Sequence, residues 1–219
     1  MARAVPKTPG PLAFLSDIHG NLEALTAVLD DLAQRDVKRI HVVGDILLGG
    51  PSPLEVWRRL EQVVAICIRG LSDTALASVS ANAVRAKNDA ERDKLAAFLE
   101  TRAKVGDLVL ERLRRLPERH RIPLLDGREI VMVHGSPLDT SSEISHEDTD
   151  EEMLALLDDD PADVFVVGGT HVPFHRVIEN VHILGAGSVG ESPAGRIADV
   201  TLVTPSVDGP DIEQYYVEY

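Results

Sequence analysis

The sequence predicts a mixed α/β fold, and three observations support this prediction. In the first part of the chain, short apolar runs that end in Ser, Gly or Asp alternate with segments whose apolar residues recur at helical spacing. The middle is rich in the helix formers Ala, Leu, Arg, Lys and Glu. The last part returns to short apolar runs without long intervening helices, which favours antiparallel or mixed strands. A layered β core flanked by helices accommodates all three.

The first part repeats a unit of strand, polar loop and helix. The first strand ends at Ser16 and Asp17, and the second ends at Gly44 and Asp45. A segment with an apolar helical face follows each of them. Strands are therefore expected over residues 12–15, 40–43 and 63–68, with helices over 22–32 and 54–60. Cys67, in the third apolar run, is expected to be a buried structural residue and not a nucleophile.

The middle and last parts differ in their pattern. A helical insertion is expected over about residues 75–116, with Leu108, Leu113 and Leu116 on its buried face before Pro117 ends it. Strands are expected over residues 130–133, 164–167, 182–184 and 198–203, with a short helix near 153–157. Because the sequence shows no internal repeat and its length suits one core, residues 1–219 are expected to form a single domain.

Composition excludes some classes of protein. The net charge of -14 argues against general adhesion to nucleic acid, which depends on basic side chains. A small phosphorylated ligand stays compatible, because bound divalent cations attract phosphate locally. No apolar stretch reaches the roughly 18 residues of a membrane span, and the first ten residues contain no signal-peptide core. We therefore expect a soluble, cytoplasmic protein, with its oligomeric state left open.

Polar side chains recur where the expected strands end. They are Asp17, His19, Asp45, Asp73, His134 and His171. The ends of such strands commonly converge on one ligand-binding crevice. Aspartate and neutral histidine supply the oxygen and nitrogen donors that suit manganese, iron or zinc. Any one of these residues alone would more often be a helix cap or a hydrogen-bonded loop residue.

The order of the motifs is more specific than any single residue. The motifs are Ser16-Asp17-Ile18-His19-Gly20-Asn21, Gly44-Asp45, Arg69-Gly70-Leu71-Ser72-Asp73, His134-Gly135-Ser136-Pro137 and Gly168-Gly169-Thr170-His171-Val172-Pro173. Together they resemble the calcineurin-like metallophosphoesterase signature, most closely that of the small bacterial and archaeal phosphodiesterase branch. Segments 50–56, 116–119 and 187–190 are also similar to that branch, so the resemblance spans residues 12–203. It implies two mostly mixed β-sheets packed as a sandwich and flanked by helices.

The same resemblance implies a set of metal ligands. Asp17, His19 and His171 would hold a first divalent metal, such as Mn, Fe, Zn or Ni. Asp45 would bridge to a second metal, for which His134 is a further ligand. Asp45 and His134 are also the expected catalytic residues, acting on the nucleophile and on the phosphoryl group.

Three positions depart from the family pattern. Leu71 replaces an asparagine ligand and Gly169 replaces a histidine ligand, both of the second metal, so we expect one tight site and a second that is weak or absent. Ser72 replaces a histidine that contacts the substrate. Arg69 and Ser72 are the candidates for substrate binding, although Arg69 could equally be a salt-bridged arginine. Compensating donors would come from two nearby histidines, His146 and His175, which could also be ordinary surface residues.

The function expected from this pattern is hydrolysis of a small phosphomonoester or phosphodiester by metal-activated water. The alternative is a catalytically weak or inactive member that binds a phosphate or nucleotide and retains one metal site. A third possibility, an interaction protein that uses the acidic residues of segment 143–163, has no specific motif behind it.

Overall fold

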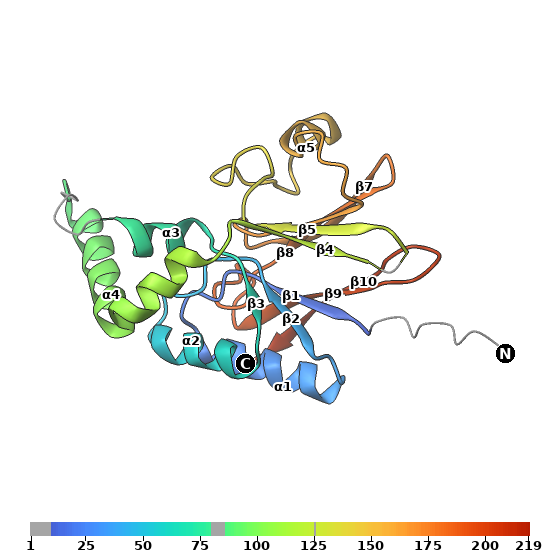
Figure 1. Ribbon diagram of the computed structural model, residues 1–219. Coiled ribbons are helices and arrows are strands. Elements are labelled where there is room, and N and C mark those ends of the chain that lie inside the picture. Colours follow the sequence, from blue (N-terminus) through green and yellow to red (C-terminus); the bar gives the residue numbers. More distant parts are fainter. Residues whose placement is uncertain (1–9, 80–85, 125) are drawn as a thin grey trace.

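The computed structural model describes residues 10–79, 86–124 and 126–219, so residues 80–85 of the expected helical insertion lie outside the described part. Two five-stranded sheets form the centre of the fold (Figure 1). Sheet A has the order β10-β9-β1-β2-β3, with β1 Leu12–Leu15, β2 Arg39–Val42, β3 Ile66–Cys67, β9 Ile197–Thr204 and β10 Asp211–Glu218. Sheet B has the order β4-β5-β6-β8-β7, with β4 Arg119–Pro123, β5 Glu129–Val133, β6 Val164–Val167, β7 Pro173–Ile178 and β8 Val181–Ala186.

Both sheets are mixed. In sheet A, β1, β2 and β3 run parallel, β9 pairs antiparallel with β1, and β10 pairs antiparallel with β9. In sheet B, β5, β6 and β8 run parallel, while β4 and β7 pair antiparallel at the two edges. The parallel strands therefore form the interior of sheet B, and the loops that follow them leave from the same end of the sheet.

The two sheets pack face to face through alternate residues of their strands. Phe14 on β1 shares one buried cluster with Met132 on β5 and Val166 on β6. The intervening residues of β1, Ala13 and Leu15, point to the opposite face and pack with helices. Since successive side chains of a strand alternate in direction, β1 is buried on both faces. The expected sandwich is thus confirmed.

Five helices in the described residues flank the sandwich. They are α1 Leu22–Gln34, α2 Pro53–Gln62, α3 Leu71–Ser78, α4 Asp89–Arg115 and α5 Asp150–Leu156. Figure 1 shows α1 and α2 below sheet A, α5 above sheet B, and α3 with α4 at one end of the molecule. Apolar residues of α1 and α2 complete the core under sheet A, and Met153 of α5 packs on Phe165 and Val167 of β6. None of the helices in the described ranges is both long and apolar enough to cross a membrane.

Two expectations about local structure were wrong. The apolar run 63–68 is a strand only at Ile66–Cys67, because Val63 caps the end of α2 and Val64 turns the chain with a φ of 54°. Leu108 is 69% exposed, whereas Leu113 is fully buried as expected. Leu108 and Leu113 lie five residues apart, about 140° around a helix of 3.6 residues per turn, so they cannot share one face of α4; the buried face comprises Thr101, Val105, Val109, Leu110 and Leu113. Burial raises the pKa of the Cys67 thiol to about 12, in keeping with a structural residue.

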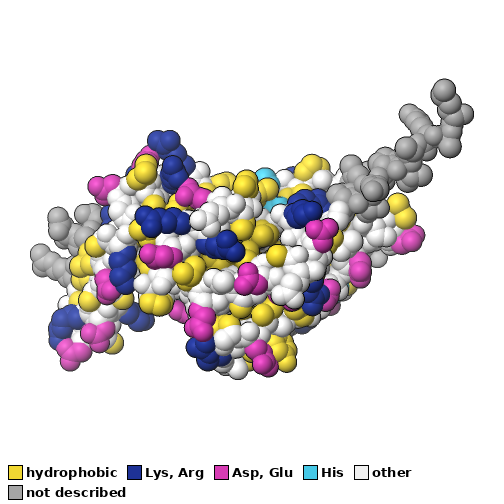
Figure 2. Space-filling model, turned by 90° about the horizontal axis from the view of Figure 1, so that it is seen from below, with side chains coloured by type: hydrophobic (Ala, Val, Ile, Leu, Met, Phe, Trp, Pro, Cys, Tyr) yellow, Lys and Arg dark blue, Asp and Glu magenta, His cyan; other side chains and the backbone are white. Residues whose placement is uncertain are grey.

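The surface shows mixed charge on the face that carries α1 and α2. Seen from below in Figure 2, acidic and basic side chains are interspersed with apolar ones. Such a surface offers no extended basic track on this face, which agrees with the net charge of -14.

Candidate metal centre

Loops from both sheets bring the predicted site residues together. Asp17 and His19 follow β1, and Asp45 follows the parallel neighbour β2. From sheet B, His134 follows β5 and His171 follows β6, which are also parallel neighbours. Because the carboxyl ends of parallel strands lie at the same edge of a sheet, the five side chains meet at one end of the sandwich.

Four of these five residues have an unusual backbone conformation. The φ angles of Asp17, His19, Asp45 and His171 are 53°, 48°, 51° and 59°. For residues other than glycine, this left-handed region costs roughly 1–2 kcal/mol per residue. Hydrogen bonds between the loops hold it in place: the Asp17 amide donates to Gly44 O (3.1 Å) and the His19 amide to Asp45 O (3.0 Å). Strain gathered in this way is typical of functional sites.

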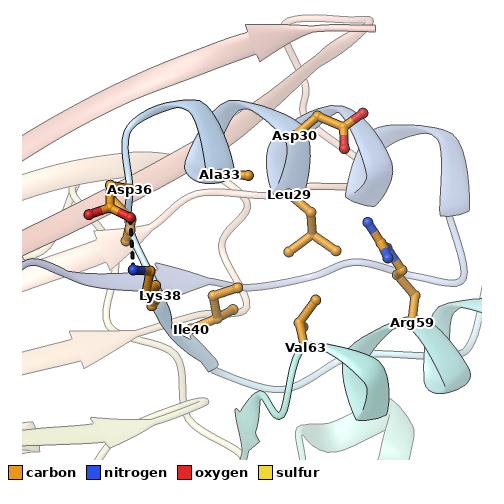
Figure 3. A pocket seen from close by; sticks show the side chains of 9 residues that line it. Leu29, Asp30, Ala33, Asp36, Lys38, Ile40, Arg59 and Val63 are labelled. Carbon is orange, nitrogen blue, oxygen red and sulfur yellow. Dashed lines mark ion pairs between the residues drawn. The ribbon is translucent and has the colours of Figure 1, made fainter.

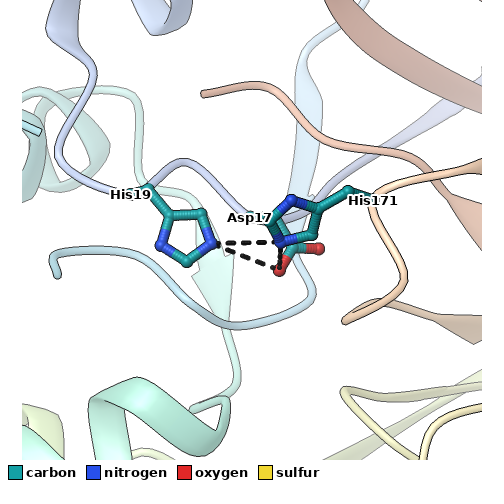
Figure 4. Close-up of side chains that lie close together, drawn as sticks. All are labelled: Asp17, His19 and His171. Atoms are coloured by element: carbon teal, nitrogen blue, oxygen red, sulfur yellow. Dashed lines mark hydrogen bonds and ion pairs between the residues drawn. The ribbon is translucent and has the colours of Figure 1, made fainter. Parts of the chain in front are cut away.

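A first cluster joins Asp17, His19 and His171 (Figure 4). The Nε2 atoms of the two histidines lie 3.2 Å apart, and Asp17 Oδ1 lies 3.6 Å from His19 Nε2 and 3.2 Å from His171 Nε2. Asp17 is fully buried, yet its Oδ1 has no hydrogen-bond partner in the described residues. A buried oxygen without a hydrogen-bond partner that faces two imidazole nitrogens is suited to bind a cation together with them.

Main-chain carbonyls determine which nitrogen of each histidine is free. The Nδ1 atom lies 2.6 Å from Leu48 O in His19, 3.1 Å from Glu191 O in His171 and 2.7 Å from Val43 O in His134. A carbonyl only accepts, so Nδ1 must carry the proton in all three rings. The Nε2 lone pair is then available for a metal, the arrangement found around metal-binding histidines in general.

A second cluster joins Asp17, Asp45 and His134, so Asp17 belongs to both clusters. His134 Nε2 lies 3.5 Å from Asp45 Oδ1, which also accepts a hydrogen bond from the Ser72 amide at 2.9 Å. Gly70 permits this approach, because a Cβ there would collide with the Asp45 carboxylate. The resemblance implies that Asp45 bridges the sites, whereas the side-chain positions put Asp17 at their junction.

The clusters perturb the protonation of their members. Burial by itself raises the pKa of Asp17, but the imidazoles of His171 and His19 lower it below its usual range. Burial lowers the pKa of His19, yet the Asp17 carboxylate raises it overall to about 9. Burial likewise lowers the pKa of His134, but the Asp45 carboxylate raises it overall to about 9. Both aspartates are therefore anionic at neutral pH, and a divalent cation would replace the protons that the imidazoles hold.

The donor set fits a divalent metal. Carboxylate oxygen and neutral imidazole nitrogen suit Mn, Fe, Zn or Ni, and the buried Asp17 oxygen lacks any other partner. The first cluster keeps every ligand that the resemblance implies, while the second has Asp17, Asp45 and His134.

The two candidate substrate residues differ. The Arg69 guanidinium donates to Leu116 O (3.1 Å) and Arg114 O (2.6 Å) and pairs with Glu118 at 2.6 Å. These contacts tie the end of α4 and the link that precedes β4 to the segment after β3, and they favour the salt-bridge alternative for Arg69. The Ser72 amide contacts the centre, because it donates to Asp45 Oδ1. The buried Oγ of Ser72 has no hydrogen-bond partner among the described residues.

The two histidines suggested as compensating donors lie outside both clusters. His175 Nε2 is 3.0 Å from His182 Nδ1, and the two rings stack on the paired strands β7 and β8. The carbonyl of His146 accepts from Arg176, also away from the clusters. The suggestion that these histidines compensate for the missing ligands has no support in the geometry.

The two departures at the second cluster have different surroundings. Leu71 is 56% exposed, so it does not belong to the core. Gly169 has a φ of 84° and donates its amide to Asp17 Oδ2 at 3.1 Å. A Cβ at this position would come within 3.0 Å of Glu143 Cγ, so the Glu143 side chain lies directly beside the place of the missing side chain.

Three acidic residues near the centre had no role assigned from the sequence. Asp73 is fully buried and accepts from the amides of Ile46 and Gly70, which positions the loop that carries Asp45. Burial and the Asp45 charge raise the pKa of Asp73 to about 6. Glu191 Oε2 lies 3.9 Å from His19 Nε2, and Glu143 lies beside Gly169. Of the three, Asp73 alone was marked by the sequence as a polar residue that follows an expected strand.

A separate hollow of about 400 Å³ lies between α1, the start of β2 and the end of α2 (Figure 3). Leu29, Ile40 and Val63 form its apolar wall. It lies at the amino end of β2, whereas Asp45 follows the carboxyl end. The hollow is therefore not part of the metal centre.

Overlapping Asp and His clusters at the ends of strands from two packed sheets define a metal-dependent hydrolytic centre. The chain belongs to the calcineurin-like phosphoesterase superfamily, whose domain model matches residues 11–207. The expected resemblance is confirmed, and with it the general class of metal-dependent phosphoesterases.

Related proteins support the same branch of the family. An uncharacterized protein of Methanocaldococcus jannaschii is 28% identical over 184 residues, covering 81% of this chain and 69% of that protein. The phosphodiesterase YfcE of Escherichia coli K12 is 26% identical over 204 residues, covering 90% and 88% of the two chains. A crystal structure of a metallophosphoesterase from Sphaerobacter thermophilus has a TM-score of 0.76 at 25% identity, covering 96% of this chain and 89% of that one.

Proposed function

We propose that this protein hydrolyses a small phosphomonoester or phosphodiester at the centre formed by its two clusters. The observation that carries the proposal is the buried Asp17 carboxylate, which is shared by both clusters and has one oxygen without a hydrogen-bond partner in the described part of the chain. The net charge of -14 favours a small phosphorylated substrate over nucleic acid. The cytoplasmic location expected from the sequence stays a prediction.

Asp17, His19 and His171 would hold one cation, and Asp17, Asp45 and His134 would hold a second more weakly. Bound divalent cations supply Lewis acidity toward the phosphoryl oxygens and lower the pKa of water. Asp45 would orient the attacking water, since the Ser72 amide fixes its Oδ1 at 2.9 Å. When the second cation is absent, His134 would instead present Nε2 toward the phosphoryl group, because its Nδ1 proton is donated to Val43 O. Ser72 Oγ, which lacks a partner, would be available to the substrate.

The alternative is a catalytically weak or inactive member that binds a phosphate or nucleotide and retains one metal. Leu71, Ser72 and Gly169 favour it, because these replacements remove two ligands and a substrate contact from the second cluster.

A hydrolytic assay with added MnCl₂ would separate the two functions. We expect turnover of bis(p-nitrophenyl) phosphate or p-nitrophenyl phosphate, abolished by EDTA and strongly reduced in Asp45→Asn and His134→Ala. His175→Ala, outside both clusters, is the control and should keep its activity. If the metal-loaded protein hydrolyses neither ester but binds inorganic phosphate, the hydrolytic proposal is wrong and the alternative holds.

A further inference from the structure

We propose that Glu143 takes the place of the ligand missing at position 169 and supplies a carboxylate to the second cluster. The inference rests on the proposed function, because it concerns a metal at Asp17, Asp45 and His134. It adds a ligand that the family pattern does not contain.

The first observation is the space beside Gly169. A Cβ built on Gly169 would lie 3.0 Å from Glu143 Cγ, 3.2 Å from Cδ and 3.2 Å from Oε1. A side chain at position 169 would thus begin in tight contact with the Glu143 side chain, which would have to shift to make room for it. Because residue 169 has no side chain, the Glu143 carboxylate can lie beside it.

The second observation is that this volume adjoins the cluster. The Gly169 amide donates to Asp17 Oδ2 at 3.1 Å, and the Gly168 amide donates to His134 O at 2.9 Å. Gly169 is therefore one hydrogen bond from the carboxylate that both clusters share. The three side-chain torsions of Glu143 allow its carboxylate to turn toward Asp17 and His134 once a cation compensates the repulsion between the Glu143 and Asp17 carboxylates.

The third observation is that the loop holds Glu143 in this position. On one side, the Ser142 amide donates to Asp139 O (2.9 Å), and Gly135 packs under the carbonyl of Thr140. On the other side, Ile144 is fully buried in the cluster outside sheet B. Within the described residues, the Glu143 carboxylate forms neither a hydrogen bond nor an ion pair, so no competing partner holds it.

A carboxylate ligand would change the chemistry of the second site. With Glu143, the second site would have three carboxylates and one imidazole. This is a harder donor set than that of the family pattern, in which a second imidazole and an amide take part. Such a set favours Mn²⁺ or Mg²⁺ over Zn²⁺ relative to the family pattern. The second site should then be weaker than the first but present.

Calorimetric titration of the metal-free protein with MnCl₂ tests this assignment. We expect two classes of sites in the wild type. In Glu143→Gln the weaker class should lose at least about 10-fold in affinity, since even residues behind metal ligands contribute that much. The stronger class should be unchanged, which also shows that the variant is folded.

Glu147→Gln is the matched control, because it removes the same charge from another residue of the same loop that is exposed, as Glu143 is, but does not lie beside Gly169. Unchanged weaker binding in this control supports a specific role of Glu143. The inference is overturned if Glu143→Gln binds Mn²⁺ like the wild type, or if the wild type shows only the stronger class. Both results leave the proposed function standing, whereas a wild type that binds no Mn²⁺ overturns both.

Discussion

Asp17 is the residue on which the whole centre depends. Its peptide carbonyl accepts from Gly190 N (2.9 Å) and from Ser188 Oγ (3.0 Å), and its Oδ2 accepts from Gly169 N. Oδ1, which faces the histidines, is the one oxygen of Asp17 that accepts no hydrogen bond from the described residues. The loops after β6 and β8 thus position a residue that follows β1.

Removal of a ligand from the first cluster should reduce metal content. We expect His19→Ala, and likewise Asp17→Ala, to lower the affinity for the tightly bound ion by at least about 10-fold, because water must replace a fixed donor. The fold should be retained in both. Elemental analysis after dialysis gives the metal content, and circular dichroism reports the fold. His175→Ala should keep the wild-type content; an unchanged content in both cluster variants would refute the ligand assignment.

His41 is a buried histidine outside both clusters. It is 2% exposed on β2, stacks on Phe14 with ring centroids 5.0 Å apart, and its Nδ1 has no hydrogen-bond partner in the described chain. Burial lowers the pKa of His41 from 6.5 to about 4. It is therefore neutral in the folded protein under conditions in which the unfolded chain takes up a proton.

This lowered pKa predicts a loss of stability in acid. The folded pKa lies below the unfolded one, so the contribution of His41 is complete above pH 6.5 and falls as the pH drops toward 4. Between pH 7 and pH 5 the wild type should lose about 2 kcal/mol more than His41→Leu. Urea unfolding of both proteins in EDTA at the two pH values measures this difference. Parallel losses in the two proteins would show that His41 does not titrate as stated.

The residue types of the centre could be predicted from the sequence, because aspartate and histidine directly follow apolar strand runs. Glu143 and Glu191 could not, since no local pattern marks them. Their positions depend on how two long loops fold against Gly169 and His19. The contacts of Arg69 were likewise undecidable, because its partners lie some 45–49 residues away in sequence.

Among the elements, strands buried on both faces were predicted, whereas three of the four edge strands were missed. β6, buried at all four positions, was predicted with the bounds 164–167. β4, β7 and β10 were not, and each lies at the edge of a sheet and alternates between exposed and partly buried residues. Such strands contain no continuous apolar run, and their pairing is decided by a neighbour that is already in place.

The different exposure of Leu108 and Leu113 on α4 leads to a prediction about stability. Leu113→Ala should lower the free energy of unfolding by about 2–5 kcal/mol, because Leu113 is fully buried and its removal leaves a cavity. Leu108→Ala is the matched control and should change stability by less than about 0.5 kcal/mol, since Leu108 is 69% exposed. Denaturant unfolding measures both. Equal losses would mean that Leu108 contributes to the core as much as Leu113 does.

For the molecule as a whole, the metal centre joins the two sheets. Asp17 and Asp45 come from sheet A, while His134 and His171 come from sheet B. A bound cation would therefore link the sheets at one end, in addition to the apolar cluster between them. Binding that requires this arrangement adds to the stability of the folded chain by mass action, about 2.7 kcal/mol when the free ion is at 100 times its Kd.

This linkage should depend on pH, because protons compete with the metal for the imidazoles. The pKa values of His19 and His134 are about 9 in the metal-free protein, so below pH 9 a cation must displace the protons that both rings carry. Affinity should fall as the pH is lowered from 9 to 6, by up to about tenfold per pH unit for each protonated histidine. At a constant, subsaturating concentration of MnCl₂, the rise in Tm over the EDTA-treated protein should accordingly shrink over that range. The His41 contribution cancels, because it is common to both samples. A rise in Tm that is independent of pH would show that these histidines do not bind the ion, and a rise that persists in His19→Ala would place the ion elsewhere.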